Sequence, residues 1–132
     1  MIVNEAITVE TSKQREVLDL TVKINDLLKK TGIDKGMLNL WVAHTTAALT
    51  VNENDKGLWN DLLGVFTQLA PVKGDYRHKP NAQAHILSSI VKPGVTIPVN
   101  DGEMDLGTWQ RPLLLELDGP RERTIKITLM VE

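Results

Sequence analysis

The stretch LLLELDGPRERTIKITLMV, residues 113–131, holds two β-rich runs on either side of a turn. Residues 113–117 and residues 124–131 are apolar or β-branched at alternating positions, which is the pattern of strands. Asp118-Gly119-Pro120 between them has the composition of a turn. The stretch therefore predicts two consecutive antiparallel strands, joined as a hairpin that closes the chain.

Two strands and a helix are expected at the start of the chain. Residues 2–11 mix β-branched and polar side chains and predict a strand, whereas residues 15–20 fit a second strand or the start of a helix. We favour a hairpin of these two segments. A helix over residues 21–30 follows, and Gly32 ends it.

The middle of the chain adds strands around a histidine and a longer helix. Residues 37–43 predict a strand that delivers His44 at its end, and residues 45–51 fit a short strand or a bend. Apolar side chains then recur at helical spacing between the polar cluster 52–55 and Pro71, which stops the helix.

A third helix and a further strand complete the prediction. Asn81 can cap a helix over residues 82–90, and residues 95–99 predict a strand in which Pro98 favours an edge or a bulge. Strands outnumber helices, so the predicted class is α+β. We expect one compact domain over residues 1–132, with a largely antiparallel sheet packed with about three helices.

The composition excludes several classes of function. With 132 residues, a formal net charge of −2 and no dense cluster of Lys or Arg, the chain lacks the electrostatic footprint of a nucleic-acid-binding protein. It has no apolar run of membrane-spanning length and no signal-peptide pattern at its start. The absence of cysteine excludes disulfides and thiolate chemistry. We expect a cytoplasmic protein that binds neither nucleic acid nor a membrane, with Trp41 and Trp59 as ordinary core residues.

The chain has three histidines, and each lies in a short polar segment. His44 follows a predicted strand, His78 lies in a loop beside Arg77, and His85 lies within a predicted helix. Three imidazoles can hold a zinc ion and leave one position open for chemistry. The sequence contains neither His-x₃-His nor His-x-His, so spacing alone leaves open whether the three meet. Each could equally be an ordinary hydrogen-bonded or exposed residue.

Two other segments carry groups suited to a site. Glu53 could orient an imidazole or act as a general base, but a carboxylate at a helix start is also favoured by the helix dipole. Residues 107–110, Gly-Thr-Trp-Gln, place hydrogen-bonding side chains on either side of an indole. With the preceding Asp101-Gly102 turn they could cradle an anion with backbone N–H groups, or simply form a tight turn with a packed tryptophan.

Taken together, these segments resemble the YjbQ family, whose members are also called secondary thiamine-phosphate synthases. The resemblance spans essentially the whole chain, and the combination of its motifs is specific. The segments that carry it are HTTAALTVNEN (residues 44–54), YRH (76–78), NAQAHI (81–86), DG (101–102) and LGTWQ (106–110).

The resemblance implies a compact α+β fold, a homotrimer, and a pocket in which His44, His78 and His85 hold a divalent metal, most often zinc. Combined with the chemistry of the residues, it assigns catalytic roles to Glu53, His44, His85 and Arg77. The substrate-binding wall, which a neighbouring subunit can supply, comprises Thr45, Asn52, Asp101, Gly102, Gly107, Thr108, Trp109 and Gln110. Only Lys79-Pro80 separate His78 from Asn81, where many relatives carry a longer acidic loop, so a more open pocket is expected.

The activity that the resemblance implies is a weak or side activity, the joining of a pyrimidine pyrophosphate to a thiazole phosphate with loss of pyrophosphate. The leaving group requires positive charge, from Mg²⁺ or from basic residues such as Arg77, Arg111 or Arg121. A three-histidine site suits zinc-type chemistry better. A metal-dependent hydrolase of a small phosphorylated or ester substrate, and a non-enzymatic protein that binds a metal or small ligand, are the alternatives.

Overall fold

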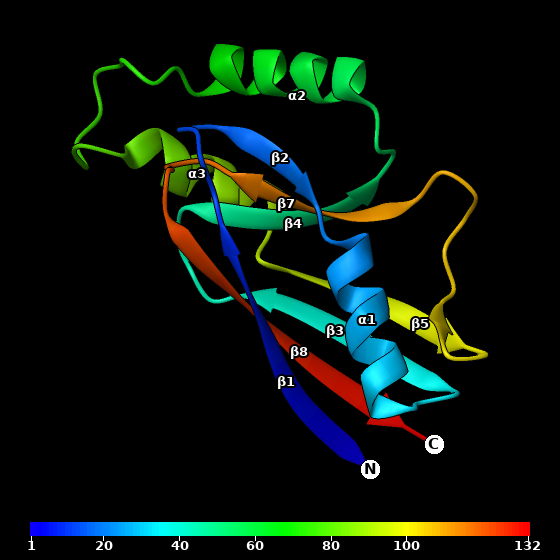
Figure 1. Cartoon of the computed structure of the whole chain (residues 1–132). Helices are drawn as coiled ribbons and strands as arrows, with labels where there is room; N and C mark the ends of the chain where they lie inside the picture. Colours follow the sequence, from blue (N-terminus) through cyan, green and yellow to red (C-terminus); the bar gives the residue numbers. More distant parts are fainter.

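The computed structural model describes residues 1–132 and contains eight strands and three helices. The strands form two antiparallel sheets, a five-stranded sheet in the order β1-β8-β3-β5-β6 and a three-stranded sheet in the order β2-β7-β4 (Figure 1). Their bounds are β1 Ile2–Glu10, β2 Glu16–Asp19, β3 Gly36–Val42, β4 Ala47–Asn52, β5 Gly94–Asn100, β6 Glu103–Met104, β7 Arg111–Glu116 and β8 Glu122–Val131. The predicted α+β class and the three helices are confirmed, although the antiparallel strands form two sheets.

The helices begin and end where local signals place them. They are α1 (Thr21–Thr31), α2 (Lys56–Leu69) and α3 (Ala82–Val91). Gly32 ends α1 in the left-handed conformation, with φ at 68°. Asp55 caps α2, because its carboxylate accepts hydrogen bonds from the first-turn N–H groups. None of the three helices is long and apolar enough to cross a membrane.

Two hydrophobic cores divide the molecule into layers. One core lies between the two sheets and includes side chains of α1, and the other lies between the three-stranded sheet and the helices α2 and α3. Figure 1 shows α2 above the three-stranded sheet and the five-stranded sheet below the three-stranded sheet. Strand β7 serves both cores, because Leu114 faces the first while Leu113 and Leu115 face the second.

The predicted closing hairpin is wrong. Strand β7 pairs with β2 and β4, whereas β8 pairs with β1 and β3 in the other sheet. The chain thus changes sheets at Asp118-Gly119-Pro120. The physical reason is that β7 is buried on both faces. Its three consecutive leucines, Leu113, Leu114 and Leu115, point to alternate faces, so apolar side chains must pack against both faces of this strand. A continuous apolar run of this kind is typical of a central strand, not of a strand with one solvated face.

The predicted N-terminal hairpin is also wrong. Strand β1 pairs along its full length with β8, from Ile2 opposite Met130 to Glu10 opposite Glu122. Strand β2 instead pairs with β7. The prediction for Pro98 is confirmed: on one side β5 pairs with β3, and on the other it meets only the two-residue strand β6.

The outer face of the five-stranded sheet is uncovered and partly apolar. Trp41 lies there with 49% of its surface exposed, so its predicted place in the core is wrong. Trp59 is half-buried and packs against the second core. One row across four strands of this face consists entirely of exposed apolar residues, in the register Pro98, Met37, Met130 and Ile2.

Candidate functional site

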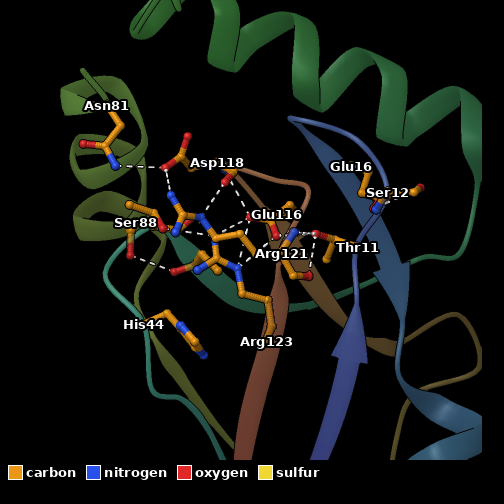
Figure 2. Close-up of polar contacts among 12 residues, drawn as sticks. Thr11, Ser12, Glu16, His44, Asn81, Ser88, Glu116, Asp118, Arg121 and Arg123 are labelled. Atoms are coloured by element: carbon orange, nitrogen blue, oxygen red, sulfur yellow. Dashed lines mark hydrogen bonds and ion pairs between the residues drawn. The ribbon is translucent and has the colours of Figure 1, made fainter. Parts of the chain in front are cut away.

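A polar cleft of ≈360 Å³ lies where the chain leaves β3 and enters β4. Residues from the β3–β4 connection, the start of α3 and the start of β8 line it, and no carboxylate is among them. Figure 2 shows several of these side chains beside α3. The lining residues are Ala43, His44, Thr45, Thr46, Asn81, His85, Arg121 and Arg123.

His44 is fixed in this cleft by the backbone of β8. Its Nε2 accepts a hydrogen bond of 3.0 Å from the N–H of Thr124. Because Nε2 is the acceptor, the neutral ring carries its proton on Nδ1. Burial first, and then the positive charge of Arg123, hold the pKa of His44 below its usual value of 6.5. His44 is therefore a neutral imidazole at neutral pH, with a donor as its second nitrogen.

His85 lies between the cleft of His44 and a second hollow that contains His78. It lines the cleft of His44 and also an adjacent hollow of ≈480 Å³ formed with Arg77 and His78. The rings of His78 and His85 meet edge to face, with their centroids 4.7 Å apart. Helix α3 is held in place because the hydroxyl of Ser88 donates to the carbonyl of Ala47, at 2.7 Å.

A buried ion pair supports one side of the cleft. Arg123 and Glu116 are fully buried, and the Arg123 Nε lies 2.9 Å from a Glu116 carboxylate oxygen. Arg123 also donates to the carbonyl and hydroxyl oxygens of Thr46. Glu116 accepts from the hydroxyl of Thr11 (Figure 2). Burial acts to raise the pKa of Glu116, but hydrogen bonds from Arg123, Thr11 and the Asp118 N–H outweigh it and lower the pKa.

Arg121 stands at the mouth of the cleft, oriented by Asp118. Its Nε donates to the Asp118 carbonyl and its Nη2 donates to the Asp118 carboxylate, both at 2.8 Å. The amide nitrogen of Asn81 donates to the same carboxylate at 2.8 Å (Figure 2). The Nη1 of Arg121 has no acceptor in the chain, and half of the side-chain surface is exposed.

Sequence reasoning missed the pair Arg123–Glu116 and the role of Asp118. One signal could have found the pair. Alternation in β8 places Arg123 on the same face as Ile125 and Ile127, which are core residues. An arginine on the apolar face of a strand requires a buried carboxylate, and Glu116 lies within the apolar run that precedes the turn.

The three predicted metal ligands do not fit a metal ion as they are arranged. No three His, Asp or Glu side chains of the chain lie together in a geometry that could hold one. His44 has no free lone pair to offer, because its Nε2 is engaged by Thr124 and its Nδ1 is protonated. The cleft lining also contains no carboxylate that could serve as a further ligand.

Glu53 and Asn52 lie at the other end of β4. Within one chain, Asn52 pairs with Arg111 at one end of β7, whereas Ala47, beside the histidine cleft, pairs with Glu116 at the other. Strand β4 has six residues and so spans roughly 20 Å. Glu53 instead borders a mainly apolar cavity of ≈160 Å³ beneath α2. Its carbonyl there accepts the indole N–H of Trp59.

Of the other predicted wall residues, Thr45 lines the histidine cleft, and residues 107–110 precede β7 at this far end. Asp101 and Gly102 form the predicted turn, with φ at 53° and 76°. The amide oxygen of Gln110 accepts from the Gly107 N–H at 2.8 Å, which closes the next turn. Arg111 donates to the carbonyl of Thr108. Trp109 between them is 70% exposed, so its indole is free to contact another molecule.

These features define a small two-sheet α+β domain with a polar cleft, of a size that suits a small molecule, at one end of its sheets. The chain belongs to the YjbQ family: the family model described as "UPF0047 protein YjbQ-like" matches residues 5–132.

Relatives and solved structures agree with this assignment. The chain is similar to a UPF0047 protein of Methanothermobacter thermautotrophicus, with 35% identity over 95% of this chain and 90% of the relative. It is 36% identical to the UPF0047 protein YugU of Bacillus subtilis, over 96% and 98% of the two chains. The fold matches a YbjQ-like protein of unknown function from Sulfolobus solfataricus, with a TM-score of 0.95, 34% identity, and coverage of 100% and 99%.

Proposed function

We propose that the protein is an enzyme acting on a small phosphorylated substrate in the cleft of His44, His85 and Arg121. The observation that carries the proposal is the lining of this cleft, which joins two imidazoles and a partly free guanidinium and contains no carboxylate. Such a set favours an anionic group and offers proton donors and acceptors beside it. It is a cytoplasmic small-molecule enzyme in this proposal, consistent with a cysteine-free chain.

The proposed reaction is thiamine-phosphate synthesis, as a main or side activity. In it, the thiazole nitrogen forms a bond to the methylene carbon of the pyrimidine, and the bond from that carbon to the pyrophosphate oxygen breaks. Pyrophosphate leaves with the electron pair of that bond, so negative charge develops on its oxygen. Donors aimed at this oxygen would lower the barrier. The side chains of His44 and Arg121 are the candidates for that role.

A complete site would require a second copy of the chain. Trp109 and Gln110 precede β7 at its Arg111 end, opposite the end that pairs beside the histidines, so one chain does not bring them together. We propose a homotrimer in which each cleft faces this end of β7 in its neighbour. The exposed apolar row of Pro98, Met37, Met130 and Ile2 supports self-association.

A zinc ion held by His44, His78 and His85 is a second candidate for the cleft. The edge-to-face contact of the His78 and His85 rings supports it only in that two imidazoles lie close together. His44 would have to release the Thr124 N–H and turn a free nitrogen toward them. Mg²⁺ bound together with a phosphorylated substrate is the corresponding alternative. Either ion would stabilise negative charge on the departing group.

Turnover by two histidine variants tests the proposal. Untagged protein is given the pyrimidine pyrophosphate and the thiazole phosphate, with Mg²⁺, with Zn²⁺ or with a chelator, and thiamine phosphate is measured. His44→Ala and His85→Ala are expected to lose at least about 100-fold in rate. Lys30→Ala, which removes an exposed positive charge from the last turn of α1, is the control and should match the wild type.

Retained turnover in both histidine variants would remove the cleft from the mechanism. Release of phosphate from a panel of phosphate esters, without any thiamine phosphate, would favour the hydrolase instead. Stoichiometric binding of a metal or small ligand, with no turnover of any substrate, would indicate a non-enzymatic binding protein.

A further inference from the structure

We propose that the cleft binds an oxyanion directly, through the Nδ1–H of His44 and the Nη1 of Arg121, without a bridging metal ion. The inference rests on the proposed function and names the part of the substrate that this cleft receives, a phosphate or pyrophosphate group. Four observations about the cleft carry it.

The first observation is the direction of the hydrogen bond to His44. The backbone N–H of Thr124 is a permanent donor, so Nε2 must be an acceptor and the proton of the neutral ring lies on Nδ1. Nδ1 has no partner within the chain. A ring held in this state presents an N–H, which an anion can accept and a metal ion cannot use.

The second observation is the preorganisation of Arg121. Two of its donors are held by Asp118, one on the carbonyl and one on the carboxylate. This clamp fixes the plane of the guanidinium while leaving Nη1 without an acceptor. An arginine restrained in this way loses little entropy when it binds a phosphate oxygen.

The third observation is the balance of charge. The two carboxylates nearest to the cleft are already engaged, Glu116 by Arg123 and Asp118 by Arg121 and Asn81. None of their side chains lines the cleft, whereas Arg121 and Arg123 do. The charge of each arginine is balanced by its own carboxylate, and an oxyanion in the cleft would meet hydrogen-bond donors and no carboxylate side chain.

The fourth observation is the set of further donors on the rim. The hydroxyl of Thr45 has no partner in the chain and lines the cleft, as does the imidazole of His85. Asn81, which precedes the ten-residue helix α3, lines it too. These groups could reach further oxygens of the same anion.

Calorimetric titration of the full-length protein with inorganic pyrophosphate, in the presence of a chelator, tests the inference. One pyrophosphate per chain is expected to bind, and inorganic phosphate is expected to bind more weakly, since it has fewer oxygens to share. Arg121→Ala and His44→Ala should each weaken binding by about 10-fold or more, the loss of one charge-assisted contact. Lys30→Ala should bind as the wild type does.

His44→Gln guards against a variant that simply fails to fold. Glutamine can accept from the Thr124 N–H and still donate, so it should bind pyrophosphate more tightly than His44→Ala does. Thermal unfolding of each variant establishes that the fold is present.

Two results would overturn the inference. One is the absence of pyrophosphate binding under chelation with binding restored by Zn²⁺ or Mg²⁺, and the other is unchanged affinity in both Arg121→Ala and His44→Ala. Thiamine-phosphate synthesis that persists in the first case leaves the proposed function intact. Pyrophosphate binding without any turnover, in contrast, supports the oxyanion site and contradicts the proposed function.

Discussion

The backbone N–H of Thr124 donates to the Nε2 of His44 at a distance of 3.0 Å. This contact ties the end of β3 to the start of β8, and it sets the tautomer of the only imidazole that the backbone holds in place. The same strand supplies Arg123 one residue earlier, whose guanidinium is buried beside the cleft. The orientation of His44 is thus built into the pairing of β3 with β8.

Removing one partner of the buried ion pair is expected to destabilise the fold strongly. Arg123→Ala or Glu116→Ala leaves the other charge buried without its partner, which costs about 3–5 kcal/mol of unfolding free energy. Urea denaturation followed by circular dichroism measures the loss. The double variant Glu116→Leu/Arg123→Met should recover most of it, since well-packed apolar residues often replace such a pair without cost. Equal stability of Arg123→Ala and the wild type would contradict this account.

Arg121→Ala, in contrast to these variants, is expected to change the stability of the fold little. Its ion pair with Asp118 is half-exposed, so its removal should change the free energy of unfolding by no more than about 1 kcal/mol. A large loss would show that Arg121 has a structural role, and its effect on pyrophosphate binding could then not be ascribed to a direct contact.

Stability is expected to fall with acidification in two steps. The pKa values of His44 and Glu116 are both lowered in the folded protein, by burial and Arg123 for His44 and by hydrogen bonds that outweigh burial for Glu116. The unfolded chain therefore binds the extra proton first, and stability is lost as pH falls. The His44 contribution declines below pH 6.5, and the Glu116 contribution declines below pH 4.5.

Chemical denaturation across this pH range, with two variants, separates the steps. His44→Gln should flatten the upper step alone, and Glu116→Gln should flatten the lower step while being less stable overall, because Arg123 stays buried and unpaired. Stability that rises on acidification between pH 6.5 and neutral would refute the lowered pKa of His44.

Mixing two inactive variants tests whether neighbouring copies share a site. The His44→Ala variant has an impaired cleft and an intact Trp109 loop. The Trp109→Ala variant has an intact histidine cleft and an impaired loop. Unfolding and refolding the two together should restore up to about a quarter of the wild-type rate, since random assembly of a cyclic oligomer joins intact halves in that proportion. Each variant refolded alone is the control. If the mixture stays as inactive as its components, the halves do not come from different copies.

A charge in the exposed apolar row should disrupt the proposed trimer. Met37 lies between Pro98 and Met130 on the outer face of the five-stranded sheet, so Met37→Asp would place a carboxylate at the centre of the contact. Light scattering after size exclusion should show a lower mass than for the wild type. Val22→Asp, at an exposed apolar position on α1, is the matched control. An unchanged mass for Met37→Asp would exclude this face as the interface.

Local signals predicted the elements of the fold well, and their pairing poorly. Gly32, Asp55 and Pro71 mark helix ends, and such signals depend only on the chain near them. Strand pairing depends on which layer covers each face, and β7 is covered on both. The adjacency of residues 113–117 and 124–131 favoured a hairpin, but the inward-facing Glu116 and Arg123 pair with each other as the chain crosses between sheets.

The candidate site could be predicted only in part. Histidine contexts identified His44 and His85, which do line one cleft, but the spacing of the three histidines carries no information on the direction of their hydrogen bonds. Arg121 was a candidate because of its charge alone. Its clamp by Asp118 could not be predicted, because it depends on the turn between β7 and β8. Glu53 and the residues 107–110 were assigned to the same pocket, and one chain leaves them at the far end of β7.

A long-range ¹H–¹⁵N correlation spectrum of the imidazole side chains tests the tautomer and the ligand of His44 directly, and with three histidines the spectrum is uncrowded. At neutral pH we expect His44 as a neutral ring with its proton on Nδ1, and a shift of that N–H resonance when pyrophosphate is added in the presence of a chelator. A ring protonated on Nε2, or a His44 signal that responds to Zn²⁺ and not to pyrophosphate, would contradict this expectation.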